Sequence, residues 1–241
     1  MSRVGIVTGG TRGIGKAISI ELSEAGHKVA ATYAGNDQAA EEFSKATGIA
    51  TYKFDVAVFD ECAAAVKKIA EDLGGPVQIL INNAGITRDG TLHRMGPDDW
   101  NAVVQTNLTS CYNMCRNVIE DMRESEFGRI VNIGSINGQA GQYGQVNYAA
   151  AKSGIHGFTK ALAQENAAKG ITVNAIAPGY VDTDMVRAVP EKVLEKIIAR
   201  IPVGRLGYAS DIAHATGFLV EEKTSFITGS TLSINGGQHM Y

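Results

Sequence analysis

The sequence lacks any apolar run that approaches the roughly 18 residues needed for a helix to cross a membrane. It also lacks a recognisable leader, because Met1-Ser2-Arg3 runs directly into a short apolar segment. Basic residues are not in excess, since the formal net charge is -3 and the isoelectric point is near 6.0. These absences argue against a membrane-spanning or secreted protein, a nucleic-acid-binding protein and a basic protein of the membrane surface. They predict a cytoplasmic location.

Cysteine is scarce, and the chain contains only Cys62, Cys111 and Cys115. Three cysteines do not make up a framework of disulfide pairs, and their spacing does not match a metal site. Cys111 and Cys115 fall on one helix face, where buried small hydrophobic side chains are the simpler interpretation. We therefore expect reduced thiols and no metal.

What the chain does contain is typical of one α/β domain. Its 241 residues are 44% hydrophobic and 20% charged, which is enough for a sizeable core. Segments of strand character are expected at 4–8, 28–33, 49–54, 77–81, 130–133, 172–176 and 231–234. Helical patterns alternate with them at 13–25, 37–47, 59–73, 98–123, 147–169 and 209–220. The alternation predicts a single-domain, Rossmann-type doubly wound parallel sheet in a three-layer α/β/α arrangement, without a boundary in residues 1–241.

The first expected strand runs into a glycine-rich turn, Thr8-Gly9-Gly10-Thr11-Arg12-Gly13-Ile14-Gly15, and a helix follows. Glycine permits the tight turn and lets backbone N–H groups approach a pyrophosphate at the positive end of the helix. The order of strand, turn and helix therefore predicts a dinucleotide site. Its spacing, T-G-x-x-x-G-x-G, differs from the G-x-G-x-x-G of the common dinucleotide fold.

The end of the second strand indicates which dinucleotide binds. An acid there would bind the ribose 2′-hydroxyl and repel a 2′-phosphate, but the strand ends Ala31-Thr32-Tyr33. Arg12, inside the glycine turn, is placed to pair with that phosphate. Asp37 is the nearest acid, and we interpret it as part of a helix start after a turn at Gly35-Asn36. NADPH is therefore expected rather than NADH.

Residues 129–152 run from an apolar strand through a loop rich in glycine and glutamine into a helix that starts near Asn147. Ser135 follows the strand, while Tyr148 and Lys152 stand at positions i and i+4 on one helix face. A nearby ammonium favours phenolate, so Lys152 is expected to lower the pKa of Tyr148 from its ordinary value of roughly 10. Such a phenol acts as a general acid or base. Ser135 would hold the oxygen that exchanges the proton.

Four further places in the sequence border the expected site. The fourth strand ends Asn82-Asn83-Ala84-Gly85, where small residues and amides would let a ribose lie against the backbone or would form a plain turn. Asn107 is a poor helix former inside the expected long helix. It is either a satisfied core amide or the holder of a water that refills the proton of the phenol. Asp55-Val56 would flank the adenine, and 177–183 would end one wall of the nicotinamide pocket.

Together these motifs resemble the short-chain dehydrogenase/reductase family. The resemblance covers essentially the whole chain and rests on TGGTRGIG at 8–15, NNAG at 82–85, Asn107, Ser135, the Tyr148-x-x-x-Lys152 pair and PG at 178–179. It implies that Tyr148 donates the proton to a carbonyl oxygen and that Ser135 is its oxyanion partner. Lys152 would bind the nicotinamide ribose, and Asn107 would hold the relay water. The residues that the resemblance places against the cofactor are Gly9, Thr11, Arg12, Gly13, Ile14, Gly15, Thr32, Asp55, Val56, Asn82, Ala84, Gly85, Tyr148, Lys152, Pro178, Gly179, Val181 and Thr183.

Within the family, the segments 86–89, 178–185, 201–207 and 235–240 are similar to two groups that reduce 3-oxoacyl thioesters. One group acts on the acyl-carrier-protein thioester in fatty-acid synthesis. The other reduces acetoacetyl-CoA to (R)-3-hydroxybutyryl-CoA for polyhydroxybutyrate, and the glutamine-rich loop 137–145 favours this CoA group. The alternative is that these glutamines are solvated loop residues. The expected substrate contacts are Asp89, Arg94, Gln142, Tyr143, Gln145 and Tyr180.

Residues 183–206 are expected to form a lid that closes over the substrate. The prediction rests on an apolar stripe at helical spacing, formed by Val186, Val189, Val193, Ile197 and Ile201. Its basic residues would either meet CoA phosphates or an acidic carrier protein, or form a solvated face.

The family resemblance also implies a homotetramer in which the helices expected at 98–123 and 147–169 pack against their copies. An alternative class is a non-catalytic dinucleotide-binding regulator on the same fold. The presence of Asn107, Ser135, Tyr148 and Lys152 together argues against that alternative.

Overall fold

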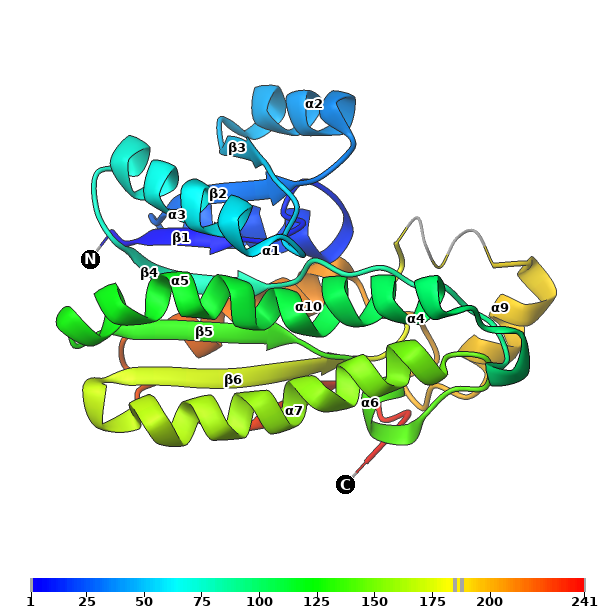
Figure 1. Cartoon of the computed structure of the whole chain (residues 1–241). Coiled ribbons are helices and arrows are strands. Elements are labelled where there is room, and N and C mark those ends of the chain that lie inside the picture. The colour runs from blue at the N-terminus through cyan, green and yellow to red at the C-terminus, as the bar shows by residue number, and fades with distance from the viewer. Residues whose placement is uncertain (1, 184–185, 187–188, 241) are drawn as a thin grey trace.

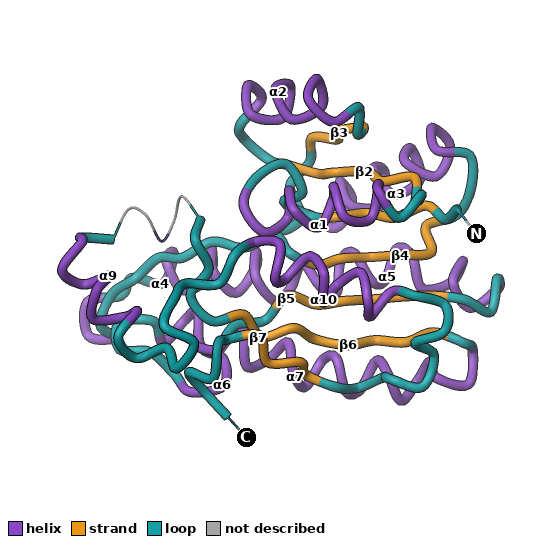
Figure 2. The backbone as a smooth tube through the Cα atoms, turned by 180° about the vertical axis from the view of Figure 1, so that it is seen from behind, coloured by secondary structure: helices purple, strands orange, loops and turns teal. Residues whose placement is uncertain are grey.

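The computed structural model describes residues 2–183, 186 and 189–240. Within them lies a seven-stranded, parallel sheet of order β3-β2-β1-β4-β5-β6-β7 (Figures 1 and 2). The strands are β1 (Val4–Val7), β2 (Lys28–Tyr33), β3 (Ala50–Lys53), β4 (Val77–Asn82), β5 (Gly128–Ile133), β6 (Ile171–Pro178) and β7 (Thr231–Ile234). The strand order reverses between β1 and β4, so the connections that leave their carboxyl ends diverge and open a crevice at that edge.

Helices cover both faces of the sheet, as Figure 1 shows. One face carries α1 (Gly13–Glu24), α2 (Asp37–Thr47) and α10 (Ala209–Val220), and the other carries α3 (Phe59–Leu73), α5 (Ser110–Glu124) and α7 (Val146–Asn166). Successive strand residues feed opposite cores, because side chains alternate along a strand. Ile79 and Ile81 of β4 pack with α1 and α10, whereas Leu80 packs with α3 and α5. This two-sided burial explains why the strands are continuous apolar runs.

The predicted doubly wound sheet is confirmed, and every expected strand is present within a few residues of its predicted bounds. The boundaries differ most at β6, which continues to Pro178, and at α7, which starts at Val146 and continues into a 3-10 turn, η3 (Ala167–Lys169). Helix ends fray and vary by such amounts, so these shifts do not alter the architecture.

The helix expected over 98–123 is present, and it contains a π turn that the sequence pattern does not predict. It consists of α4 (Pro97–Val104), a π-helical turn labelled η2 (Gln105–Thr109), and α5, which follow one another without a gap. Asn107 lies in the π turn, where its side chain exchanges two hydrogen bonds with the backbone of Ile86 in the loop after β4. We attribute the π turn to this exchange, because π turns are often found where a side chain serves a site.

Two short helical elements, α6 and η1, were not expected as helices, and a third, α9, lies where the lid showed an apolar stripe at helical spacing. A five-residue helix, α6 (Ile136–Ala140), follows β5 and begins at Ser135, whose hydroxyl accepts from the N–H of Asn137 at 3.1 Å. A 3-10 turn, η1 (Leu92–Arg94), lies in the loop after β4. Helix α9 (Glu191–Ile198) forms part of the expected lid. Within that lid, Asp184, Met185, Arg187 and Ala188 lie outside the described residues.

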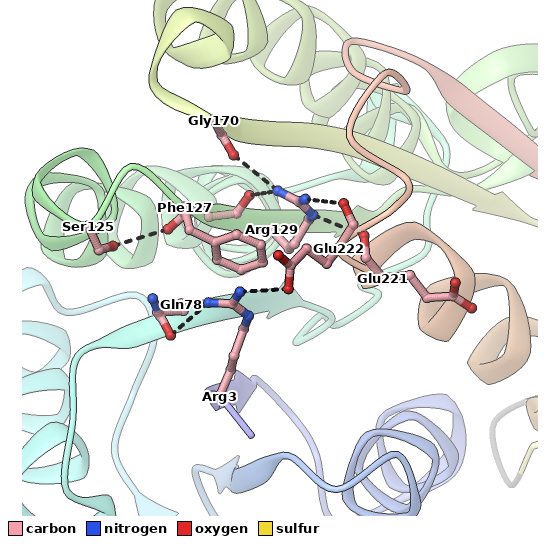
Figure 3. A network of polar contacts seen from close by, with 9 residues as sticks. Arg3, Gln78, Ser125, Phe127, Arg129, Gly170, Glu221 and Glu222 are labelled. Atoms are coloured by element: carbon pink, nitrogen blue, oxygen red, sulfur yellow. Dashed lines mark hydrogen bonds and ion pairs between the residues drawn. The ribbon is translucent and has the colours of Figure 1, made fainter. Parts of the chain in front are cut away.

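A polar network fastens the amino edge of the sheet, opposite the crevice (Figure 3). Arg129 of β5 is 2% exposed, and its guanidinium donates to the backbone carbonyls of Gly128, Gly170, Glu221 and Glu222 at 2.8–3.3 Å. Phe127 lies between two cations, with its ring centroid 4.3 Å from the guanidinium carbon of Arg129 and 3.3 Å from that of Arg3. Arg3 in turn pairs with the carboxylate of Glu222 at 3.1 Å. The network ties the segment after α10 to β5.

None of the helices in the described residues is long and apolar enough to cross a membrane.

Candidate active site

One large cavity, of about 810 Å³, opens at the carboxyl ends of the strands. Residues from the glycine turn, from the ends of β2 to β6, from α6 and the start of α7, and from residues 183–197 line it. A cavity at the point where the strand order reverses is the usual ligand site of an open α/β sheet. Most of the residues predicted for cofactor, catalysis and substrate are therefore brought together in this one place.

The glycine turn has the shape that a pyrophosphate needs. Gly9 and Gly13 have φ angles of +62° and +52°, which disfavour a side chain. A Cβ on Gly15 would lie 2.1 Å from the carbonyl oxygen of Gly9, so helix α1 packs directly against the turn. The amino end of α1, which has no side chain at Gly13 and Gly15, borders the cavity and offers backbone donors and the positive end of the helix dipole. These residues fit a dinucleotide.

The end of β2 provides polar groups for the adenosine part of such a ligand. Thr32 is buried, and its hydroxyl oxygen has no hydrogen-bond partner among the described residues although it lines the cavity. Arg12 lines the cavity beside it and is exposed. Asp37 is occupied elsewhere, because the ammonium of Lys53 contacts its carboxylate at 2.8 Å. Asn36 caps α2 through its side chain, so the interpretation of Asp37 as part of a helix start is confirmed.

The residues expected at the adenine and at the far wall line the same cavity. Asp55 and Val56 line the cavity, and one oxygen of the Asp55 carboxylate accepts from the N–H of Ala57 at 2.9 Å. Pro178, Gly179, Val181 and Thr183 line the opposite side with the loop after β6, together with Tyr180.

Asn82 is not among the cavity-lining residues, contrary to its expected place beside the cofactor. Its side chain points into the core, where its amide nitrogen donates to Asn132 Oδ1 at 2.8 Å and to Cys115 Sγ at 3.4 Å. The next residue, Asn83, lines the cavity instead and donates to the carbonyl of Thr8 at 2.9 Å. The difference follows from strand alternation, since neighbouring residues at a strand end point in different directions. Ala84 and Gly85 line the cavity as predicted.

Ser135, Tyr148 and Lys152 meet at the centre of the cavity wall. Tyr148 and Lys152 lie on one face of α7, and Ser135 acts on the pKa of the Tyr148 hydroxyl, opposing the rise that burial causes. Lys152 is 4% exposed, and its ammonium donates to the carbonyl of Ile133 at 2.7 Å and lies 5.7 Å from the ring centroid of Tyr148. The end of β5 therefore positions the hydroxyl and the ammonium, and α7 positions the phenol.

The expectation that Lys152 lowers the pKa of Tyr148 is wrong for this arrangement. Burial raises the pKa of Tyr148, the hydrogen bond with Ser135 opposes that rise, and the charge of Asp89 adds to it. Burial also lowers the pKa of Lys152 to about 8. Both changes have one physical cause, because a poorly solvated site disfavours the charged form of each group.

Asn107 is a satisfied core amide, which is one of the two alternatives that its sequence position left open. It is 1% exposed, its Oδ1 accepts from the N–H of Ile86, and its Nδ2 donates to the carbonyl of Ile86, both at 2.8 Å. Gly85 must be glycine here, since a Cβ would lie 2.5 Å from Asn107 Oδ1. The side chain clamps the loop after β4 to the π turn. A role in holding water stays a prediction.

The substrate end of the cavity is lined by Asp89, Gln142, Tyr143, Gln145 and Tyr180. Gln145 donates to the carboxylate of Asp89 at 2.9 Å and accepts from the amide of Asn137 at 2.9 Å. These glutamine contacts show that Gln145 is not a freely solvated loop residue, whereas Tyr143 is 87% exposed. Arg94 lies in η1 and is not among the lining residues.

The apolar stripe of the expected lid faces the same cavity, where Val186, Val189, Val193 and Ile197 belong to the lining. Ile201 does not reach it and borders a smaller hollow of about 250 Å³ behind Tyr180.

Several lining residues with polar groups were not expected at the site. They are Tyr33, Asn36, Asn83, Thr87, Thr106 and Asn137. Asn83 and Thr106 stand next to the predicted Asn82 and Asn107, and Asn137 starts the glutamine-rich loop, so their positions were a usable signal.

Comparison with known proteins adds an independent observation. The family model described as "Enoyl-(Acyl carrier protein) reductase" matches residues 9–239. The acetoacetyl-CoA reductase of Shinella zoogloeoides is 62% identical over 239 residues, which is 99% of each chain. The acetoacetyl-CoA reductase of Rhizobium meliloti is 59% identical over 240 residues, again 99% of each chain. A 3-oxoacyl-(acyl-carrier-protein) reductase of Pseudomonas aeruginosa is 47% identical over 242 residues, which is 99% of this chain and 98% of the relative.

Proposed function

The chain belongs to the short-chain dehydrogenase/reductase family, and from this premise we propose that it is an NADPH-dependent acetoacetyl-CoA reductase. It would reduce the 3-oxo group of acetoacetyl-CoA to give (R)-3-hydroxybutyryl-CoA for polyhydroxybutyrate synthesis in the cytoplasm. The observation that carries the proposal is the single cavity that holds Ser135, Tyr148 and Lys152 next to a glycine turn of dinucleotide shape. The names of the relatives at 58–62% identity support the choice of substrate.

Tyr148 is the proton donor in this proposal. Burial raises the pKa of its hydroxyl, which keeps the phenol protonated, and Ser135 lines the cavity with it. As the carbonyl carbon of the substrate gains a hydride, the electron pair of the C=O double bond moves to oxygen, and that oxygen takes the Tyr148 proton. Ser135 holds the oxygen by a second hydrogen bond, which stabilises the charge that develops there.

The cofactor would lie along the strand ends. NADPH supplies the hydride when it is bound. The amino end of α1 would receive its pyrophosphate, Thr32 and Arg12 its 2′-phosphate, and Lys152 the ribose near the reacting carbon. The choice of NADPH over NADH is supported by two features at the end of β2: the unpartnered hydroxyl of Thr32 and the pairing of Asp37 with Lys53.

The acyl group would enter between the loop after β4 and residues 183–197. Gln145, fixed by Asp89 and Asn137, would border the thioester, and Val186, Val189 and Val193 would cover the short acyl chain. Tyr143 lies exposed at the opening, where it would meet the CoA part.

The test is a kinetic comparison of the purified chain with NADPH and either acetoacetyl-CoA or acetoacetyl-(acyl-carrier-protein). We expect a much higher kcat/KM for the CoA ester. The variant Tyr148→Phe should reduce kcat by about 10²-fold or more, the scale of general acid catalysis, while NADPH still binds. Retained turnover in that variant would exclude Tyr148 as the proton donor.

Reduction of the carrier-protein thioester is the second candidate, because the Pseudomonas aeruginosa relative is 47% identical over nearly its whole length. A preference for the carrier-protein ester in the same assay would select it, and would leave the roles of Ser135, Tyr148 and Lys152 unchanged. A chain that binds NADPH but reduces neither ester would instead be a regulator.

A further inference from the structure

The turn between β3 and α3 lines the end of the cavity beside β2, and Asp55 and Val56 contribute to that lining. Bonds within the turn and with the start of α3 hold its shape. The Asp55 carboxylate accepts from the N–H of Ala57 at 2.9 Å, and the N–H of Val58 donates to the carbonyl of Asp55 at 3.1 Å. The carboxylate of Glu61 accepts from the N–H of Asp55 at 2.8 Å. These bonds join residues that are close in sequence, so they fix the shape of the turn rather than its place against other elements.

One further bond comes from a distant element. Asn113 of α5 is 3% exposed, and its side-chain amide donates to the carbonyl of Val56 at 2.9 Å. The two residues are 57 positions apart in the sequence. The thiol of Cys62 on α3 also approaches this carbonyl, at 3.4 Å, but a thiol is a weak donor. The amide of Asn113 is therefore the stronger of these two side-chain donors to the Val56 carbonyl.

Aromatic packing brings the same two segments together on the solvent side. Phe59, at the start of α3, stacks against Tyr112 of α5 with 6.1 Å between the ring centroids. Tyr112 precedes Asn113 in the sequence and is exposed, whereas Asn113 is buried. Ring packing does not select the direction of a peptide carbonyl, but a hydrogen bond is directional. The orientation of the Val56 carbonyl therefore depends on Asn113 rather than on the rings.

This orientation reaches a side chain of the cavity wall. The carbonyl of Val56 and the N–H of Ala57 belong to one planar peptide unit. Asn113 donates to one end of this unit, and the Asp55 carboxylate accepts from the other end. A rotation of the unit would therefore disturb both the backbone at Val56 and the direction of the carboxylate. A carboxylate held in this way can accept from the exocyclic amine of an adenine, which is a donor.

We propose that Asn113 is a positioning residue for the adenosine half of the cofactor. It acts through the peptide unit between Val56 and Ala57 and does not touch the ligand itself. The inference rests on the proposed function, in which a dinucleotide lies along the strand ends with its adenine beside Asp55 and Val56. The ammonium of Lys152 is held by α7 and by the end of β5, so the effect of Asn113 is confined to the adenosine half.

The first experiment uses isothermal titration calorimetry to measure binding of adenosine 2′,5′-bisphosphate, which represents the adenosine half of NADPH. Asn113→Ala should raise the Kd for this fragment by about threefold to tenfold, the scale of one neutral hydrogen bond. Asn113→Leu, which fills the space but lacks the donor, should raise it by a similar factor. In the reduction of acetoacetyl-CoA, both variants should raise KM for NADPH and leave kcat unchanged.

Asn117→Ala is the matched control. It removes the same amide one turn further along α5, where the half-buried side chain donates to the carbonyl of Asn113 at 2.8 Å, outside the cavity lining. This variant should leave the Kd for the fragment unchanged.

The second experiment locates the change in the protein without ligand. Hydrogen exchange should be faster at the amides of Ala57 and Val58 in Asn113→Ala than in the wild type, because both N–H groups bond to Asp55. Faster exchange there with an unchanged Kd for the fragment would make Asn113 a structural residue only and overturn the proposal. A wild type that binds NADPH but not the fragment would overturn it as well. A raised Kd in a protein that reduces no acyl thioester would contradict the proposed function and leave the role of Asn113 standing.

Discussion

Lys152 and Tyr148 share one face of α7, and burial moves their pKa values in opposite directions. It lowers the pKa of Lys152 to about 8 and raises that of Tyr148. The sequence spacing predicts that the two groups lie together, but it does not predict how far burial removes each of them from water. An ammonium in water would favour phenolate, whereas here the buried ammonium bonds to the carbonyl of Ile133. Desolvation therefore outweighs the attraction that the spacing suggests.

The lowered pKa of Lys152 predicts a pH-dependent stability. In the unfolded chain Lys152 holds its proton up to about pH 10.5, whereas in the folded protein it releases it near pH 8. Between these values the unfolded chain binds more protons, so the contribution of Lys152 to the free energy of unfolding rises with pH. From pH 7.5 to 10.5, wild type should gain up to about 3 kcal/mol relative to Lys152→Met. Urea unfolding of both proteins measures this difference, in which the titration of Tyr148 cancels. A difference independent of pH would contradict it.

We predict that Arg12 gives the protein its preference for NADPH over NADH. Arg12→Ala should raise KM for NADPH by about tenfold, the scale of one lost charge-assisted hydrogen bond, and should change KM for NADH little. Steady-state kinetics with both cofactors tests this. Lys16→Ala is the control, because Lys16 lies exposed on α1 outside the cavity lining. Equal losses with the two cofactors would mean that Arg12 binds the shared pyrophosphate instead.

At the scale of elements, hydrogen bonds between segments that are distant in sequence determine features that the local sequence pattern does not predict. The π turn between α4 and α5 contains Asn107, which bonds to Ile86 in the loop after β4. This contact lies at the carboxyl edge, where the site lies. At the amino edge, the Arg129 guanidinium donates to four backbone carbonyls from three segments. The partners of Asn107 and most partners of Arg129 are distant in sequence, so the local pattern does not predict these bonds.

Substitution of Arg129 measures how much the network at the amino edge contributes to stability, separately from the active site. Arg129→Met keeps the length of the side chain but leaves the part-buried carbonyls of Gly170, Glu221 and Glu222 without their donor, so the free energy of unfolding should fall by about 2 kcal/mol. Denaturant unfolding measures the loss, and kcat at 25 °C should be unchanged. The control Arg116→Met removes an exposed pair with Glu120, which should cost less than about 1 kcal/mol. Similar losses in the two variants would show that the buried network contributes little.

At the scale of the whole molecule, exposed aromatic side chains predict assembly. Trp100 of α4 and Tyr112 of α5 are 37% and 52% exposed, and they lie on the helices that the family resemblance assigns to subunit contacts. We expect light scattering to give four copies of the 25.5 kDa chain. Tyr112→Asp should lower that mass by placing a charge at a buried contact. Phe226→Asp is a control on a fully exposed side chain outside these helices. A monomer in the wild type would contradict the prediction.

The sequence by itself determined the layered sheet and most of the cavity wall. Strand patterns such as Val77–Asn82 and the glycine turn at 8–15 depend on interactions between near neighbours, so periodicity and turn chemistry suffice to predict them. The tertiary structure alone decided that Asn83 rather than Asn82 faces the cavity, that Asn107 clamps Ile86, and that Asn137 reaches Asp89 through Gln145. It also decided the directions in which the pKa values of Tyr148 and Lys152 move. These features depend on burial and on partners distant in the chain, which exist only once the strands have been brought side by side.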